Sequence, residues 1–201
     1  APHITGVMAL LKQAHPDLSS LELKSLLMGH AKFLNDENKK PYLLSRQGAG
    51  RVQADLSVKG LIVSSDTVDF SLGKMSVKTS KEIKRTFHLR NISAKTLNLH
   101  VDLKSDRGLT MTPTADFTLA AGESKALSLT FIVDARGLSQ AATELDGMML
   151  FTSNGQEVHR IPVLAVIEKR SQVTADHLLI KAADHLAMVT LQNQGVRAGE
   201  A

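Results

Sequence analysis

The stretch Leu127-Ser128-Leu129-Thr130-Phe131-Ile132-Val133 places a large apolar side chain at every second position. This period of two is typical of a β-strand that buries one face. Residues 97–103 repeat the pattern, and shorter apolar runs extend it over the following and preceding chain. The predicted strands number about seven, in the ranges 68–72, 83–89, 97–103, 109–119, 127–133, 148–151 and 158–167.

Turn residues between these strands support the same interpretation. Asn154-Gly155 is a strong hairpin signal, because both residues tolerate the positive φ of a tight two-residue turn. Pro162 lacks a backbone N–H and is therefore predicted on an edge strand. Seven half-buried strands in about 105 residues predict an all-β sandwich of the immunoglobulin-like or fibronectin type III-like kind.

The first sixty residues show helical spacing instead. Apolar residues between Ile4 and Leu11 recur at intervals of three and four, which predicts a helix of about three turns. Pro2 suits the first turn of that helix, and Pro16 ends it. A second helix is predicted from Ser19, because Ser19 and Glu22 form a capping box and the side chains of Leu18 and Leu23 flank it.

The remainder of this first region is predicted as loop and short apolar segments. Residues 35–41 are polar and rich in turn formers, which indicates a surface loop. The sequence Gly48-Ala49-Gly50 indicates a tight backbone feature before the short apolar run 52–56. The change of pattern places the boundary between two structural units near residues 55–65.

Composition excludes several function classes. The 201 residues carry a net charge of +4, with basic residues scattered along the chain and only 3 % aromatic residues. A nucleic-acid-binding protein usually has a basic stripe and stacking aromatics, so no nucleic-acid partner is expected. The absence of cysteine excludes disulfides and thiolate chemistry. No apolar run approaches the roughly 18 residues that a membrane-spanning helix needs.

Three segments of the first region resemble the subtilisin-like serine protease family. Residues 1–11, Ala-Pro-His-Ile-Thr-Gly-Val-Met-Ala-Leu-Leu, look like the segment that follows the nucleophile in the pattern G-T-S-M-x-x-P-H-[VI]-[AST]-G. Residues 17–27 resemble the next helix of the family. Residues 48–54 resemble its closing G-x-G-x-[VL]-[ND]-[AV] segment, with Gln53 where Asn or Asp is usual.

The resemblance implies that the nucleophilic serine lies three positions before Ala1, at the N-terminus of the first helix. The aspartate, the histidine and the oxyanion-binding asparagine would lie further upstream, so no catalytic residue is assigned within this chain. Ala1, Pro2 and His3 are then neighbours of the nucleophile, and His3 is expected to pack or to hydrogen-bond beneath it. The chain is accordingly expected to be an internal piece of a longer protease.

A second resemblance concerns the predicted sandwich. The segments 89–93, Leu-Arg-Asn-Ile-Ser, and 119–124, Leu-Ala-Ala-Gly-Glu-Ser, are similar to "L-x-N-x-S" and "L-x-A-G-E-S" of the fibronectin-like domain in cell-envelope subtilases. The resemblance implies a mixed fold: the helical C-terminal piece of an α/β subtilase domain in residues 1–60, then a fibronectin type III-like sandwich in residues 61–168. Residues 169–201 are expected to begin a further β-domain or tail, since residues 189–195 echo residues 87–93.

Two other motifs have weaker functional interpretations. The glycines Gly48 and Gly50 could suggest dinucleotide binding, but Gln53 stands where that fingerprint requires Gly, so a structural role is favoured. Ala-Asp-His-Leu occurs twice, with Asp176-His177 and Asp184-His185. These pairs lack further ligands at a recognisable spacing, so no metal and no cofactor are expected to bind this chain.

The leading hypothesis is a serine endopeptidase that cleaves peptide bonds through an acyl-enzyme, with this chain supplying scaffold helices and an accessory sandwich. The family resemblance implies protein or peptide substrates, an upstream catalytic segment as partner, secretion or attachment to the cell envelope, and calcium sites elsewhere in the parent protein. Two alternatives stay open: a non-catalytic sandwich that binds or spaces, and a pseudoprotease scaffold.

Overall fold

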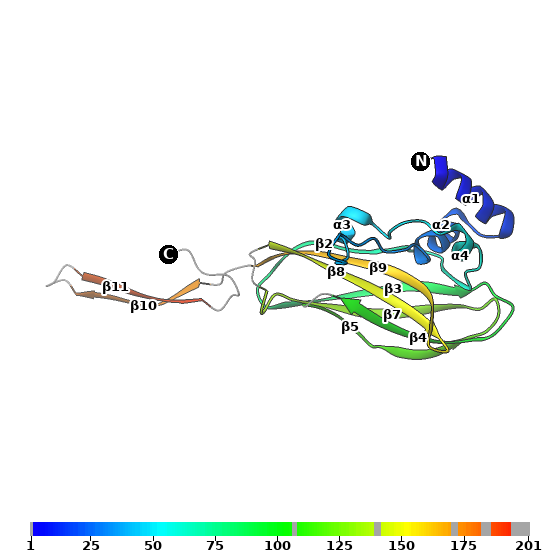
Figure 1. Ribbon diagram of the computed structural model, residues 1–201. Coiled ribbons are helices and arrows are strands. Elements are labelled where there is room, and N and C mark those ends of the chain that lie inside the picture. The colour runs from blue at the N-terminus through cyan, green and yellow to red at the C-terminus, as the bar shows by residue number, and fades with distance from the viewer. Residues whose placement is uncertain (1, 106–107, 139–141, 170–172, 182–185, 194–201) are drawn as a thin grey trace.

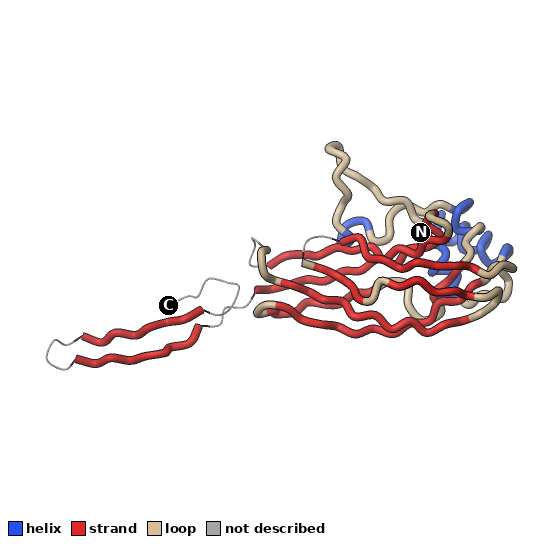
Figure 2. The backbone as a smooth tube through the Cα atoms, turned by 90° about the horizontal axis from the view of Figure 1, so that it is seen from below, coloured by secondary structure: helices blue, strands red, loops and turns tan. Residues whose placement is uncertain are grey.

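The computed structural model describes residues 2–105, 108–138, 142–169, 173–181 and 186–193, the last two ranges as backbone. Two β-sheets pack face to face between residues 62 and 169; α1 (Pro2–Ala14), α2 (Ser20–Gly29) and α4 (Ala54–Val58) gather near one end of their strands, and α3 (Leu44–Gln47) lies apart over the five-stranded sheet (Figures 1 and 2). The architecture within the described residues is therefore a β-sandwich with a helical segment attached, which agrees with the predicted sandwich class.

The first sheet has four strands in the order β1-β3-β7-β5, all paired antiparallel. The longest pairing joins β3 to β7, with Ser80 opposite Asp134 and Arg90 opposite Ser124. The strands are β1 (Ile62–Ser64), β3 (Ser80–Asn91), β7 (Ser124–Asp134) and β5 (Leu109–Thr112).

The second sheet has five strands in the order β2-β9-β8-β4-β6. The edge strand β2 runs parallel to β9, whereas the other pairs are antiparallel. The β8–β9 hairpin turns at Asn154-Gly155, both with positive φ, as the sequence predicted. The strands are β2 (Phe70–Val77), β9 (Gln156–Lys169), β8 (Ala142–Ser153), β4 (Leu97–Ser105) and β6 (Ala115–Leu119).

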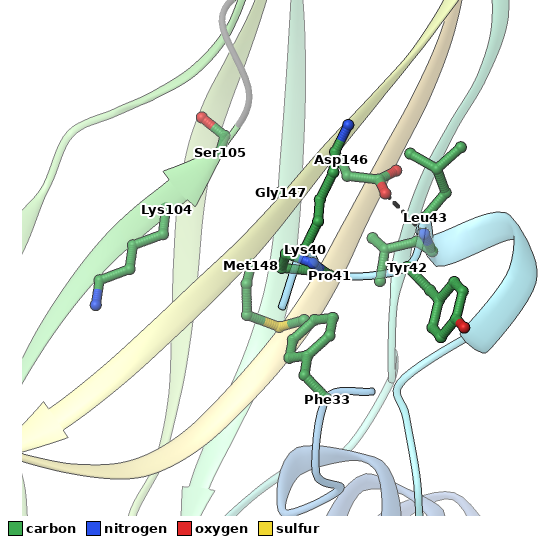
Figure 3. Close-up of a pocket in the computed structure, with 11 residues that line it drawn as sticks. Phe33, Lys40, Pro41, Tyr42, Leu43, Lys104, Ser105, Asp146, Gly147 and Met148 are labelled. Carbon is green, nitrogen blue, oxygen red and sulfur yellow. Dashed lines mark hydrogen bonds between the residues drawn. The ribbon is translucent and has the colours of Figure 1, made fainter. Parts of the chain in front are cut away.

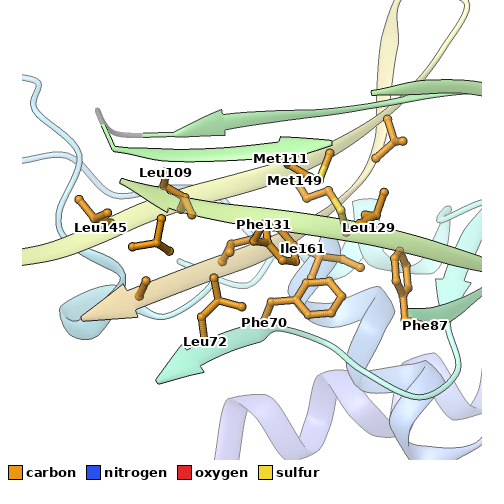
Figure 4. Packing of buried hydrophobic residues seen from close by; sticks show 14 of the residues in the cluster. Phe70, Leu72, Phe87, Leu109, Met111, Leu129, Phe131, Leu145, Met149 and Ile161 are labelled. Carbon is orange, nitrogen blue, oxygen red and sulfur yellow. The ribbon is translucent and has the colours of Figure 1, made fainter. Parts of the chain in front are cut away.

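The sandwich core consists of the inward-facing residues of both sheets (Figure 4). Phe131 of β7 is fully buried, and its ring lies 5.2 Å from that of Phe70. Phe70 in turn meets Phe87 edge-on at 5.3 Å, so aromatic contacts join strands of the two sheets. The alternation predicted for 127–133 is confirmed: Leu129, Phe131 and Val133 are buried.

Two strand predictions were wrong in detail. The single run predicted over 109–119 is two strands, β5 and β6, which belong to different sheets and separate at Pro113. Pro162 lies in β9, an interior strand, and not on an edge. The pairing of β9 with β2 begins at Val163, so Pro162 stands just before that ladder, where a missing N–H costs no bond to β2.

The helical segment comprises residues 2–60. Both predicted helices form, and the capping box of the second is present: Ser19 accepts from the Glu22 backbone N–H, and the Glu22 side chain accepts from the Ser19 backbone N–H. The helices are α1 (Pro2–Ala14), α2 (Ser20–Gly29), α3 (Leu44–Gln47) and α4 (Ala54–Val58).

Two small apolar clusters attach this segment to the sandwich. The first joins Leu11, Leu18, Leu23 and Leu26 to Val63 of β1. Since α2 contacts both β1 and β9, it lies across strands of both sheets at one end of the sandwich. The second cluster, under the loop before α3, consists of Leu44, Met148 and Leu150 with Phe33 and Leu164 at its margin.

This second cluster explains why β8 is apolar on both faces. Met149 and Phe151 point into the sandwich core, whereas Met148 and Leu150 point outward and are covered by residues of the helical segment. A strand that is buried on both faces has a continuous apolar sequence, and residues 148–151 have such a sequence.

Beyond the sandwich, β10 (Val173–Lys181) and β11 (Leu186–Asn193) pair antiparallel with each other and with neither sheet (Figure 1). Asp176 and His177 lie in β10, but their side chains are outside the described part of the chain. Asp184 and His185 lie wholly outside the described residues. The expectation that residues 169–201 begin a further domain stays a prediction.

Candidate functional site

The first turn of α1 carries the residues that sequence reasoning placed beside a nucleophile. Ala1 lies outside the described residues, whereas Pro2 and His3 begin the helix and are exposed. The expected packing of His3 beneath a reactive serine therefore stays a prediction.

The rest of α1 is apolar but poorly covered. Leu11 is its only buried residue, while Val7 and Met8 are half-buried against the first apolar cluster. Ile4 and Leu10 are 42 % and 53 % exposed, so the stripe predicted between Ile4 and Leu11 is buried only at its C-terminal end. The N-terminal part of α1 thus presents an apolar surface to solvent.

A buried hydroxyl connects α2 to both sheets. The Ser25 Oγ accepts a hydrogen bond from the Ser64 backbone N–H of β1 at 2.9 Å. The same oxygen lies 3.2 Å from Nε2 of His159 on β9. Ser25 and His159 are each 1 % exposed, so one side chain of the helix bridges the two sheets inside a buried interface.

His159 is the most perturbed ionisable group of this interface. Burial is the main cause that lowers its pKa to about 3, and the electrostatic effects of His30 and Arg160 act in the same direction. The ring packs against Gly29 so closely that a Cβ there would lie 2.1 Å from Cε1 of His159. His159 is therefore a neutral packing residue at neutral pH, and Gly29 is the small residue that admits it.

An ion pair between Glu22 and Arg90 also joins α2 to the four-stranded sheet. Oε1 of Glu22 lies 2.7 Å from Nη2 of Arg90 on β3. Glu22 is 7 % exposed and uses its other oxygen in the capping box. Its carboxylate therefore caps α2 and holds the helix against the four-stranded sheet. Sequence reasoning found the cap but not the ion pair, because Glu22 and Arg90 are distant in sequence.

The loop before α3 is held by two carboxylates of β8. The Leu44 N–H donates to Oδ2 of Asp146 at 2.7 Å, and the Ser45 N–H donates to Oε1 of Glu144 at 3.0 Å. These bonds satisfy backbone donors at the start of α3 that the helix itself leaves free. They fix the residues before α3 over the outer face of the five-stranded sheet.

A cavity of about 330 Å³ lies beneath this loop (Figure 3). Phe33, Tyr42 and Met148 form apolar parts of its wall, and Lys40 and Lys104 also line it. The cavity is open to solvent and carries no grouping of nucleophile, base and orienting acid. Its lining thus combines apolar side chains with two lysines and the carboxylate of Asp146.

The two sandwich motifs meet at Asn91. Its Nδ2 donates to the carbonyl oxygens of Lys95, Leu119 and Ala120 at 2.7, 3.0 and 3.0 Å. Its Oδ1 accepts from the N–H and hydroxyl of Ser93. Asn91 is fully buried, so the segments 89–93 and 119–124 form one structural clamp.

The glycines Gly48 and Gly50 have a backbone role in the structure. Both adopt positive φ, and a Cβ on Gly50 would lie 2.4 Å from the carbonyl oxygen of Lys32. Gly50 thus permits the bridge between Lys32 and Arg51. This agrees with the structural interpretation drawn from the sequence.

Within the described residues, no group of three or more His, Cys, Asp or Glu side chains has the geometry to hold a metal ion. Among the same residues, none of the helices combines the length and apolar character that crossing a membrane requires.

Comparison with known proteins points to one class. The model of the subtilase family, peptidase S8, matches residues 1–50. The chain is 25 % identical over 173 residues to the minor extracellular protease Vpr of Bacillus subtilis (strain 168). This alignment covers 84 % of the chain. The same alignment spans 21 % of that relative, so the chain corresponds to about a fifth of its length. These matches support a relationship to the subtilase family.

Solved structures resemble the chain only loosely. The VesB protease of Vibrio cholerae aligns at a TM-score of 0.31 with 15 % identity, covering 70 % of this chain and 41 % of that one. Native α2-macroglobulin of Escherichia coli, from domain MG7 to the C-terminus, aligns at 0.36 with 13 % identity, covering 63 % and 21 %. TM-scores this low do not establish a shared fold.

Proposed function

We propose that this chain is the part of a secreted subtilisin-like serine endopeptidase that carries the helix behind the nucleophile and joins it to an accessory β-sandwich. The observation that carries the proposal is the match of residues 1–50 to the subtilase family, which coincides with the helical segment of the fold. The relative that aligns over most of the chain is named as an extracellular protease, which supports secretion.

The arrangement of α1 supports this role. A serine three positions before Ala1 would stand near the N-terminus of α1, where free backbone N–H groups and the helix dipole stabilise a developing oxyanion. The helix is anchored at Leu11 against α2, and α2 is anchored to both sheets through Ser25. The exposed apolar side chains of Ile4 and Leu10 would then be covered by the rest of the catalytic domain.

Active-site labelling tests this proposal. The chain of residues 1–201 should not react with a fluorophosphonate probe, because no triad serine is assigned within it. The protein that includes the upstream coding sequence should be labelled once, at a serine three positions before Ala1, and replacement of that serine by alanine should abolish labelling. Stoichiometric labelling of the 201-residue chain would contradict the proposal, and an unlabelled longer protein with an intact fold would favour the pseudoprotease.

A second function is favoured by the cavity under the loop before α3. We propose that the sandwich, of the immunoglobulin or fibronectin type, also positions protein substrates or spaces the protease from the cell envelope. The lysines at 40 and 104 and the apolar wall formed by Phe33 and Met148 support a binding role. Replacing both cavity lysines in the protease, Lys40→Ala together with Lys104→Ala, should slow cleavage of large proteins more than cleavage of short peptides. Equal effects on both substrates would remove this role.

A further inference from the structure

The buried imidazole of His159 is held in a site that accepts only its neutral form. Nε2 faces the Ser25 hydroxyl, which can donate or accept. Nδ1 is buried and has no hydrogen-bond partner among the described residues. The backbone of Gly29 faces this edge of the ring, since a Cβ built there would lie 2.3 Å from Nδ1.

Protonation would make both ring nitrogens donors. Ser25 can accept one proton, because its oxygen retains a lone pair after accepting the Ser64 N–H. The second donor, Nδ1–H, would point at Gly29 with no acceptor, and a buried unsatisfied charged donor is strongly unfavourable. Protonation of His159 is therefore opposed by the docked position of α2, because α2 covers the ring.

The charged groups around the His159 ring also disfavour its protonation. His30, which caps the C-terminus of α2, places its ring centroid 5.7 Å from that of His159, and Arg160 of β9 adds a positive charge. Ser64 of β1 and Phe151 of β8 bring no carboxylate. The nearby carboxylate of Glu22 is already paired with Arg90 and with the Ser19 N–H.

We propose that docking of α2 on the sandwich and protonation of His159 exclude each other, so that acid releases the helical segment while the sandwich stays folded. The inference does not depend on the proposed protease function. If that function holds, the same event would remove the support of the nucleophile's helix at low pH.

The pH dependence of docking follows from the lowered pKa of His159 in the docked state. An undocked His159 has an ordinary pKa near 6.5, whereas burial lowers the pKa to about 3 in the docked state. Docking is therefore at full strength above pH 6.5. It weakens about tenfold per pH unit as the pH falls below 6.5 and continues to weaken until about pH 3.

The other histidines of the helical segment behave differently. Nε2 of His15 and Nδ1 of His30 each lie 2.9 Å from a carbonyl oxygen, of Val58 and Leu26 respectively. These nitrogens already donate, so protonation of either ring keeps its bond. The interval from pH 6.5 to 5 also lies above the ordinary range of carboxyl groups, so the pH dependence there is tested against the histidines.

Hydrogen exchange on the whole chain tests the proposal. Amide exchange is measured by mass spectrometry at pH 7, 6 and 5, with each rate divided by its intrinsic value at that pH. We expect protection of α2 to fall about tenfold per pH unit below 6.5, while protection of β7 stays constant. Protection of α2 that does not change between pH 7 and 5 would overturn the proposal.

Two variants identify the responsible group. His159→Leu removes the titrating ring and should abolish the pH dependence of α2 protection. His88→Gln, which replaces an exposed histidine paired with Asp66, should leave that dependence intact. A pH dependence that persists in His159→Leu would contradict the proposal.

Nuclear magnetic resonance of the unmodified chain keeps the test decisive if His159→Leu fails to fold. The ring signals of His159 should report the neutral form for as long as α2 remains protected. A ring that titrates near pH 6.5 while α2 stays protected would show that the docked state accepts the proton, and the inference would be wrong.

Discussion

The sandwich and the helical segment are stabilised in different ways. The sandwich encloses a continuous apolar core between two sheets, and its largest side chains are fully buried. The helical segment shares only two small apolar clusters with the sandwich, and it relies on polar bonds to the sandwich at Ser25, Glu22 and Leu44. Apolar burial is non-directional and scales with area, whereas buried polar bonds depend on exact partners. We therefore expect the sandwich to fold by itself and the helical segment to fold only against it.

The largest effect is expected from Phe131→Ala. Removing a fully buried ring that contacts Phe70 should cost about 4 kcal/mol of unfolding free energy. Urea denaturation followed by circular dichroism should show the strands and helices lost together, because the helices need the sheets. Phe117→Ala, at a half-buried edge position, is the matched control and should cost much less. Helices that outlast the strands would contradict the comparison.

Asn91→Ala should have the next largest effect. The substitution removes the side-chain donor from three carbonyl oxygens, of which that of Ala120 still accepts from the Glu123 N–H, and should cost about 3 kcal/mol. Asn98→Ala provides the control, since Asn98 is exposed on β4 and bonds only to the Thr118 hydroxyl. Thermal unfolding should separate the two variants clearly. Similar melting temperatures for both would show that the clamp is unimportant.

Gly29→Ala should separate the two regions. The new Cβ would overlap the buried ring of His159, which has no room to retreat, so α2 should undock at a cost of about 2 kcal/mol. Hydrogen exchange should then increase in α2 and not in β7. Gly6→Ala is the control, because a Cβ there meets open space and alanine favours helix. Should exchange in α2 be unaffected by Gly29→Ala, the close fit to His159 would not matter for docking.

Ser19→Ala should have the smallest effect. It removes half of the capping box and should cost about 1 kcal/mol, felt only by α2. The remaining carboxylate of Glu22 still pairs with Arg90, so docking should weaken without being lost. Exchange rates of the first turn of α2 would measure this. A change spread over the sandwich would contradict a local role for the cap.

Sequence patterns predicted the elements better than the contacts between them. The period of two gave the strands around Phe131, and the capping box located α2, because both depend on neighbours in sequence. The division of 109–119 between two sheets and the interior place of Pro162 depend on sheet order, which periodicity does not encode.

The candidate site divides in the same way. The motif at residues 1–11 indicated the family, since a fixed spacing of residue types is a local signal. The bridge from Ser25 to Ser64 and His159 could not be predicted, because it joins three distant segments. A histidine within the apolar run 158–167 was the one available hint, since a polar ring in a buried strand requires a partner.

Separate expression of the two regions tests the central claim most directly. Residues 61–169 and residues 1–60 would each be examined by two-dimensional amide nuclear magnetic resonance at pH 7. We predict dispersed resonances and cooperative unfolding for residues 61–169, and collapsed resonances of an unfolded chain for residues 1–60. A folded 1–60 segment, or a sandwich that fails to fold without it, would contradict the account.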